Sequence, residues 1–161
     1  MRKKIIGAVS GNHEDRLVKI ANYNPLETLC AELGVEFYGI SVSVRFDVGS
    51  QKYFGYFHHT TGGGGTPGGK LNRTHKLIEI YPMADFVCSA HSHQLHSSPT
   101  IKFIPNEDGT RNISHRIVGV GCGHYLDYAN SYAEKAMLQP AKIGSPRIRL
   151  NGEEKDVHVS F

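Results

Sequence analysis

Ten histidines are the unusual feature of this 161-residue sequence, and they are not evenly spread. Residues 58–59 read His-His, residues 91–96 read His-Ser-His-Gln-Leu-His, and residues 11–14 read Gly-Asn-His-Glu. Neutral imidazole nitrogen and amide oxygen suit Mn²⁺, Fe²⁺, Ni²⁺ or Zn²⁺ better than Ca²⁺. The residue types therefore predict a transition-metal site, provided that the fold brings the three segments together.

Each of the three segments directly follows a short apolar run that is typical of a strand. The runs are residues 4–9, 52–57 and 86–90. Residues just past strand ends meet at one edge of an α/β sheet, where ligands usually bind. His91 and His93 are two residues apart, so we expect them on one side of an extended segment, serving one ion or two neighbouring ions.

A glycine-rich stretch follows the first histidine pair. Residues 60–70 contain six glycines and one proline, which predict a loop. Exposed backbone N–H groups in such a loop can cradle an anion such as phosphate, although a plain flexible connection is the alternative. A lone His-x-His is also more often structural than functional. The three features in this order favour a functional site, whereas four other histidines are expected at the surface or in the core: His75, His96, His115 and His158.

Composition indicates one globular domain over residues 1–161. Apolar residues make up 39% and charged residues 20%, and the formal net charge of +3 is too mild to mark a nucleic-acid binder. The three cysteines lack Cys-x-x-Cys spacing, which fits free thiols and a cytoplasmic location. No apolar run is long enough to cross a membrane, so no membrane partner is expected.

The order of elements predicts an α/β sandwich. We expect a buried strand over residues 4–9, a helical stretch over 13–33 broken at Asn24-Pro25, and a strand pair turning at residues 47–50. Leu126, Tyr128 and Tyr132 are expected in the core rather than around a pocket. The other expected elements are a helix over 72–81 and strands over 86–90, 100–104, 113–120, 146–150 and 157–161.

The motifs as a set resemble the calcineurin-like metallophosphoesterases. Residues 11–14, His59 ahead of a glycine run, and residues 90–93 (Ala-His-Ser-His) look like that family's Gly-Asn-His-(Asp/Glu), His-Gly and Gly-His-x-His motifs. The longer stretches are similar to a branch common among phages and prophages. The likeness implies a partial metallophosphoesterase-type β-sandwich flanked by helices.

The resemblance also implies roles for individual residues. Asn12, His59 and His91 would bind one metal ion, and His93 would bind a second. His13 would not be a ligand but a catalytic residue, which acts as general acid toward the leaving oxygen or stabilises the charged transition state. Two divalent ions would activate a water molecule against a phosphoester, possible substrates being nucleotides or nucleic acid. His58 remains an alternative to His59 as the ligand.

The sequence departs from the family at its front. Neither Asp-x-His nor Gly-Asp-x-x-(Asp/Asn) stands before residues 11–14, and no room precedes them for these motifs. The one Asp-x-His in the sequence, Asp156-Val157-His158, comes after the other motifs instead of before them. The missing motifs would supply two carboxylates, one of them bridging the ions, together with N-terminal strands of the sheet. We therefore expect at most one ion in this chain alone, and a complementing N-terminal polypeptide or a homo-oligomer covering a bare sheet edge.

Three hypotheses follow. The first is a phosphoesterase that needs a separate N-terminal portion to complete a two-metal site. The second is a catalytically inactive remnant that keeps the fold and binds a single metal ion or phosphate. The third is a non-enzymatic module that binds a metal or an anion.

Overall fold

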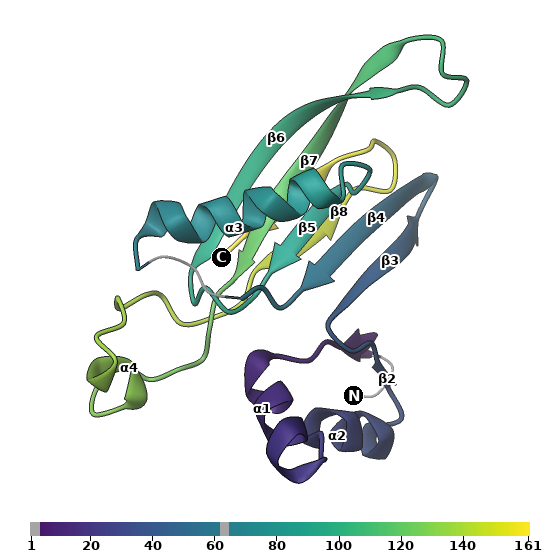
Figure 1. Cartoon of the computed structure of the whole chain (residues 1–161). Helices are drawn as coiled ribbons and strands as arrows, with labels where there is room; N and C mark the ends of the chain where they lie inside the picture. Colours follow the sequence, from purple (N-terminus) through teal and green to yellow (C-terminus); the bar gives the residue numbers. More distant parts are fainter. Residues whose placement is uncertain (1–3, 62–64) are drawn as a thin grey trace.

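A five-stranded mixed sheet is the centre of the molecule (Figure 1). The computed structural model describes residues 4–61 and 65–161. The strand order is β3-β4-β5-β7-β6, in which β4, β5 and β7 run parallel and the two edge strands run antiparallel to their neighbours. The predicted mixed α/β class is confirmed. The strands are β3 (Ser41–Val48), β4 (Gln51–His58), β5 (Phe86–Ser89), β6 (Leu95–Pro105) and β7 (Asn112–Cys122).

One helix crosses over between the parallel strands β4 and β5. Helix α3 (Pro67–Ile80) packs on β5 and β7, and its buried residues Leu77 and Ile78 meet Val87 and Ile117 of the sheet. We expected a loop over residues 60–70 and a helix only from residue 72, but the helix begins at Pro67. Proline is favoured in the first turn, and the Thr66 hydroxyl accepts a hydrogen bond from the Gly69 N–H at 3.3 Å.

The opposite face of the sheet is covered by a small hairpin. Strands β8 (Arg147–Leu150) and β9 (Val157–Ser160) pair antiparallel, and Val157 joins a core cluster with Tyr53, Phe86 and Val120. The sheet is thus sandwiched between α3 on one side and this hairpin on the other (Figure 1).

Residues 4–40 form a separate small unit beside the ends of the central strands (Figure 1). It contains helices α1 (Asn12–Ala21) and α2 (Pro25–Leu33), and the predicted helical stretch over 13–33 is interrupted before Pro25, as expected. The predicted buried strand over 4–9 is wrong in extent and burial. Only β1 (Gly7–Ala8) pairs, in parallel with β2 (Glu36–Phe37), and Ile6 is 55% exposed.

The predicted strand pair around residues 47–50, the predicted strands at 100–104 and 113–120, and the predicted free cysteines agree with the structure. The pair β3–β4 turns at Gly49-Ser50, and the antiparallel pair β6–β7 is longer at both ends than its sequence pattern indicated. Cys30, Cys88 and Cys122 are free thiols, and the first two are buried. The short α4 (Tyr132–Lys135) lies in the connection between β7 and β8. None of the described helices has the length and apolar character needed to cross a membrane.

Tyr53 ties the covering hairpin to the sheet, which predicts a measurable loss of stability on removal of its hydroxyl. The side chain is fully buried, its oxygen lies 2.6 Å from the Asn151 carbonyl oxygen, and it accepts the Asp156 N–H at 2.9 Å. Tyr53→Phe should lower the free energy of unfolding by about 1–3 kcal/mol, because both partners lose a bond. Urea denaturation measures this loss.

Tyr125→Phe is the matched control. Tyr125 is 74% exposed, and its hydroxyl donates a hydrogen bond to the Ser145 hydroxyl at the surface, so the change in the free energy of unfolding should stay within about 0.5 kcal/mol. Equal losses in the two variants would contradict the role given to Tyr53.

Candidate metal centre

The carboxyl ends of three parallel strands lie level with one another. His58 at the end of β4 pairs with Ser89 at the end of β5, and Ser89 pairs with Gly121 near the end of β7. The residues that follow must therefore leave the sheet at one edge, the edge faced by α1 (Figure 1). This places His59 beside His91, as their positions just past the strand ends predicted.

Three ligand-type atoms form a nearly equilateral triangle at this edge. The Asn12 Oδ1 atom lies 3.0 Å from His59 Nε2 and 3.0 Å from His91 Nδ1. The two ring nitrogens are 3.1 Å apart. The three residues come from three distant parts of the chain, and all three side chains are half-buried.

Hydrogen bonding among these groups cannot account for all three contacts. The Asn12 oxygen only accepts, and each facing ring nitrogen of a neutral imidazole carries either a proton or a lone pair. If both nitrogens donate to the oxygen, two N–H groups face each other. If either is unprotonated, its lone pair faces another lone pair. Exchanging the amide oxygen and nitrogen of Asn12 does not help, so every assignment leaves one pair of like groups in contact.

A cation placed to one side of the plane of the triangle, equally far from its three corners, removes this conflict, because all three atoms would then present lone pairs to it. Neighbouring ligand atoms around an octahedral ion with bonds of about 2.1 Å are about 3.0 Å apart. The sides of the triangle, 3.0, 3.0 and 3.1 Å, match that spacing. The residues present therefore fit a divalent transition metal, with one face of its coordination shell supplied by Asn12, His59 and His91.

Backbone contacts hold the three parts in place. The Thr60 hydroxyl donates to the Ala90 carbonyl at 2.8 Å, and the Ala90 N–H donates to the His58 carbonyl at 3.1 Å, which joins the two strand ends. Gly11 lies against His59: a Cβ there would be 3.1 Å from the ring carbon Cε1. Glycine at this position lets the start of α1 approach the imidazole closely.

His91 and His93 do not share one side of an extended segment, so that expectation is wrong. Their φ angles are +73° and +56°, in the left-handed region that non-glycine residues rarely adopt. Their ring centroids are 6.4 Å apart. His93 instead lies near His124, at a centroid distance of 5.4 Å, and stands apart from the triangle. Such backbone strain is often found at functional sites.

His58 and His59 are separated by the structure. His59 belongs to the triangle, whereas the His58 ring packs 6.1 Å from the Tyr56 ring. Its buried Nδ1 has no hydrogen-bond partner among the residues that the structure describes. Adjacent residues at the end of a strand point in opposite directions, so only one of them can reach Asn12.

His13 lies in the first turn of α1 with its side chain exposed. It is close enough to the site for its charge to lower the pKa of His59, His91 and His93. Its neighbour Glu14 is used locally, since the carboxylate accepts the Gly11 N–H at 2.9 Å.

The imidazoles of the site are held in the neutral form that metals bind. Desolvation by burial is the main cause that lowers the pKa of His59 below the usual value, and the charge of His91 lowers it further. Burial is also the main cause for the lowered pKa of His91, where the charge of His13 is the next contributor. Burial also lowers the pKa of His93, assisted by the charges of His124, His91 and Lys70.

One residue of this edge was missed in the sequence. His124 follows β7 in the sequence Gly-Cys-Gly-His, and a lone histidine without a partner in sequence gave no signal beyond its place after a strand. Leu126 and Tyr128 were expected in the core, but both line a cavity together with His93 and His124, and Tyr132 is 65% exposed. The expectation for these three residues is therefore wrong.

The other sequence features fall outside the site. His75, His96 and His115 bond to Ser98, Thr74 and the Ala84 carbonyl, respectively, and His158 is exposed on β9. Residues 62–64 of the glycine-rich stretch, to which we assigned an anion-cradling loop, lie outside the described residues.

Within the described part of the chain, no three His, Cys, Asp or Glu side chains come together as a metal cluster, so the triangle depends on the amide of Asn12. No family model, curated protein or solved structure matches this chain.

The two neighbouring histidines give a matched test of the triangle. His59→Ala should weaken Mn²⁺ binding at least tenfold, because it removes one of three ligand atoms, whereas His58→Ala should leave the affinity within about twofold. Isothermal titration calorimetry on the full chain measures both. Equal losses, or a larger loss in His58→Ala, would contradict the assignment.

The lowered pKa values predict how metal affinity depends on pH. Protons compete for the ring nitrogens only below the usual histidine pKa of about 6.5, since burial favours the neutral rings. Mn²⁺ affinity should therefore be constant from about pH 7 to 8 and fall as the pH drops below about 6. An affinity that keeps rising between pH 7 and 8 would show that burial does not keep these rings neutral.

Proposed function

We propose that this chain is the part of a metal-dependent phosphoesterase that carries the Asn12, His59 and His91 metal site. The triangle of ligand atoms is the observation that carries the proposal. It assembles the same three residues that the resemblance to calcineurin-like metallophosphoesterases implied. The mixed sheet of this chain, covered by α3 on one face and by the β8–β9 hairpin on the other, is compatible with part of that family's β-sandwich.

The proposed chemistry divides between the ion and the side chains. A divalent ion at such a site polarises a phosphoester and lowers the pKa of bound water. Asn12, His59 and His91 would hold it. His93, whose ring centroid is 6.4 Å from that of His91, would serve a second ion. His13, exposed in the first turn of α1, would donate a proton to the leaving oxygen, a role for which imidazole is suited near neutral pH.

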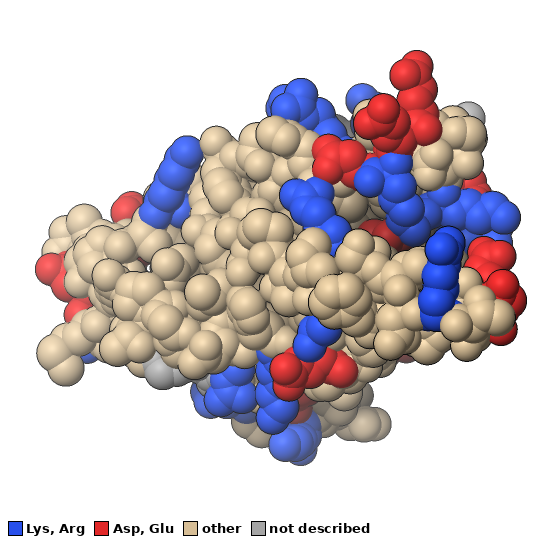
Figure 2. Space-filling model, turned by 90° about the horizontal axis from the view of Figure 1, so that it is seen from above, with Lys and Arg blue, Asp and Glu red and all other residues tan. Residues whose placement is uncertain are grey.

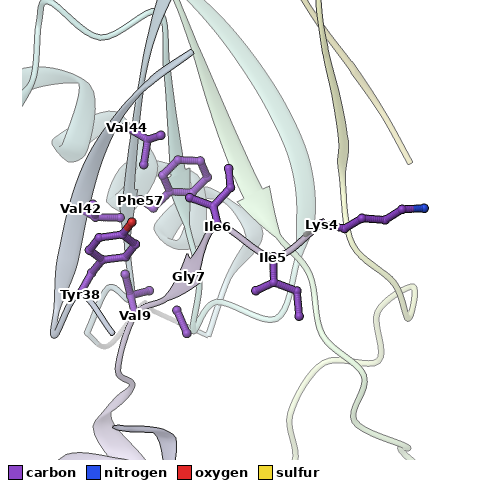
Figure 3. Close-up of a pocket in the computed structure, with 10 residues that line it drawn as sticks. Lys4, Ile5, Ile6, Gly7, Val9, Tyr38, Val42, Val44 and Phe57 are labelled. Atoms are coloured by element: carbon purple, nitrogen blue, oxygen red, sulfur yellow. The ribbon is translucent and has the colours of Figure 1, made fainter. Parts of the chain in front are cut away.

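A complementing polypeptide is part of the proposal. Two-metal sites use carboxylates, and Glu14, which lies beside this edge, is occupied in capping α1. An apolar groove of about 390 Å³ runs between residues 4–9 and the edge strand β3, lined by Ile6, Val42 and Phe57 among others (Figure 3). A partner strand that carried the missing carboxylates could bury this groove.

The surface charge favours a small phosphoester over a long polyanion. On the face shown in Figure 2, Lys and Arg side chains are interspersed with Asp and Glu, and a broad area without charged side chains lies between them. Binding along a nucleic acid usually relies on a continuous basic stripe. A nucleotide remains within the proposed substrate class.

Hydrolysis of bis-p-nitrophenyl phosphate with added Mn²⁺ tests the function. We expect turnover when the chain is mixed with a polypeptide that carries Asp-x-His and Gly-Asp-x-x-Asp, and loss of that turnover with EDTA. Metal binding without turnover in the mixture would favour the inactive remnant. No bound metal and no turnover would contradict the proposal.

His13 and His91 should separate catalysis from metal binding. His13→Ala should lower kcat by about 10²–10⁴-fold, the usual contribution of a general acid, with metal content unchanged. His91→Ala should lower both, because it removes a ligand. Activity and elemental analysis on the same samples provide the comparison, and equal loss of metal in the two variants would refute the division of roles.

A further inference from the structure

A cavity of about 110 Å³ is lined by His93 and His124. The His93 ring centroid lies 6.4 Å from that of His91, a member of the candidate metal site. Most of its other walls are apolar and come from the connection between β7 and β8, including Leu126, Tyr128 and Ala133. Asp127 also contributes to the lining, with its side chain exposed to solvent.

The cavity is joined to the triangle by a row of imidazole rings. Successive ring centroids are 5.0 Å apart from His59 to His91, 6.4 Å from His91 to His93, and 5.4 Å from His93 to His124. Lys70 is also near enough to His93 to influence it electrostatically. An anion bound near His93 would therefore lie close to imidazole rings and to the charge of Lys70.

His124 is set up as a hydrogen-bond donor rather than a metal ligand. Its Nδ1 accepts the Leu126 N–H at 3.1 Å, which assigns the ring proton of the neutral form to Nε2. A metal-bound histidine normally donates its second ring N–H instead. The Nε2–H of His124 is the one polar hydrogen that its ring can offer.

The backbone fixes the position of this ring. The Gly144 N–H donates to the His124 carbonyl at 2.8 Å, and the two residues form an antiparallel bridge. Gly123 has a φ of +72°, and a Cβ there would be 2.4 Å from the Gly144 carbonyl oxygen. Only glycine allows this approach, so His124 is held from both sides.

We propose that the cavity binds the organic group of a phosphate ester while the His124 Nε2–H donates a hydrogen bond to a phosphoryl oxygen. This inference rests on the proposed function and narrows its substrate. A cavity of roughly 150 Å³ holds a benzene molecule, and the cavity beside His93 and His124, at about 110 Å³, is somewhat smaller. The ligand class is accordingly a phosphate ester of a small alcohol with at most about one apolar ring next to the ester oxygen.

Calorimetry with non-hydrolysable probes tests the inference without turnover. Methylphosphonate and phenylphosphonate present the same anionic group with and without a ring, and each is titrated into the Mn²⁺-loaded full chain. We expect phenylphosphonate to bind about tenfold more tightly, because its ring leaves water for apolar walls.

Two substitutions address the two parts of the cavity separately. His124→Phe should weaken both probes about tenfold, since it removes a hydrogen bond to a charged group, and His124→Gln should recover part of that loss by supplying an amide N–H. Ala141→Leu, on the cavity wall, should remove the preference for phenylphosphonate and leave methylphosphonate unchanged. His158→Phe, exposed on β9, is the control and should behave as the wild type.

The possible failures are distinguishable. Equal binding of the two probes by the wild type, or unchanged binding in His124→Phe, would overturn the inference and leave the metal site intact. Loss of Mn²⁺ in His124→Phe would make His124 a ligand and also overturn it. A wild-type chain that binds no Mn²⁺ would refute the proposed function and this inference together.

Discussion

The parallel, level pairing of β4, β5 and β7 is the constraint on which the candidate site depends. Because His58, Ser89 and Gly121 stand side by side, the chain leaves all three strands at one height. Sequence positions some thirty residues apart then deliver imidazoles to a common edge without any contact between their loops being required. A one-residue slip of either pairing would turn the following side chains to the other face. The register of the strand pairing therefore decides which side chains reach the candidate site.

Much of the fold could be predicted from the sequence, since apolar runs and turn residues mark most strands and the break between α1 and α2. The errors have local causes. The apolar run over residues 4–9 looked like a buried strand, yet it pairs over two residues and keeps Ile6 exposed. Glycines at positions 68 and 69 argued against a helix, but a threonine cap and a proline in the first turn outweigh their low propensity.

The candidate site was predictable in its membership but not in its geometry. The resemblance to the calcineurin-like metallophosphoesterases implied that Asn12, His59 and His91 share a metal ion, and these three residues do meet at the edge of the sheet. The positive φ angles after β5 could not be foreseen, because histidine has no strong preference for that conformation, and they direct His93 away from His91. His124 carried no motif at all. Its place became visible only through the cavity that it shares with His93.

The oxygen of Asn12 belongs to a unit that is only lightly anchored. No residue of α1 is buried, and β1 and β2 pair over two residues each, whereas His59 and His91 follow strands of the central sheet. A cation that bridges the two parts would link the helical unit to the sheet. Part of its binding free energy would then stabilise the docked position of that unit. By thermodynamic linkage, if the bound ion favours docking of the helical unit on the sheet by some factor, docking of that unit must raise the affinity for the ion by the same factor.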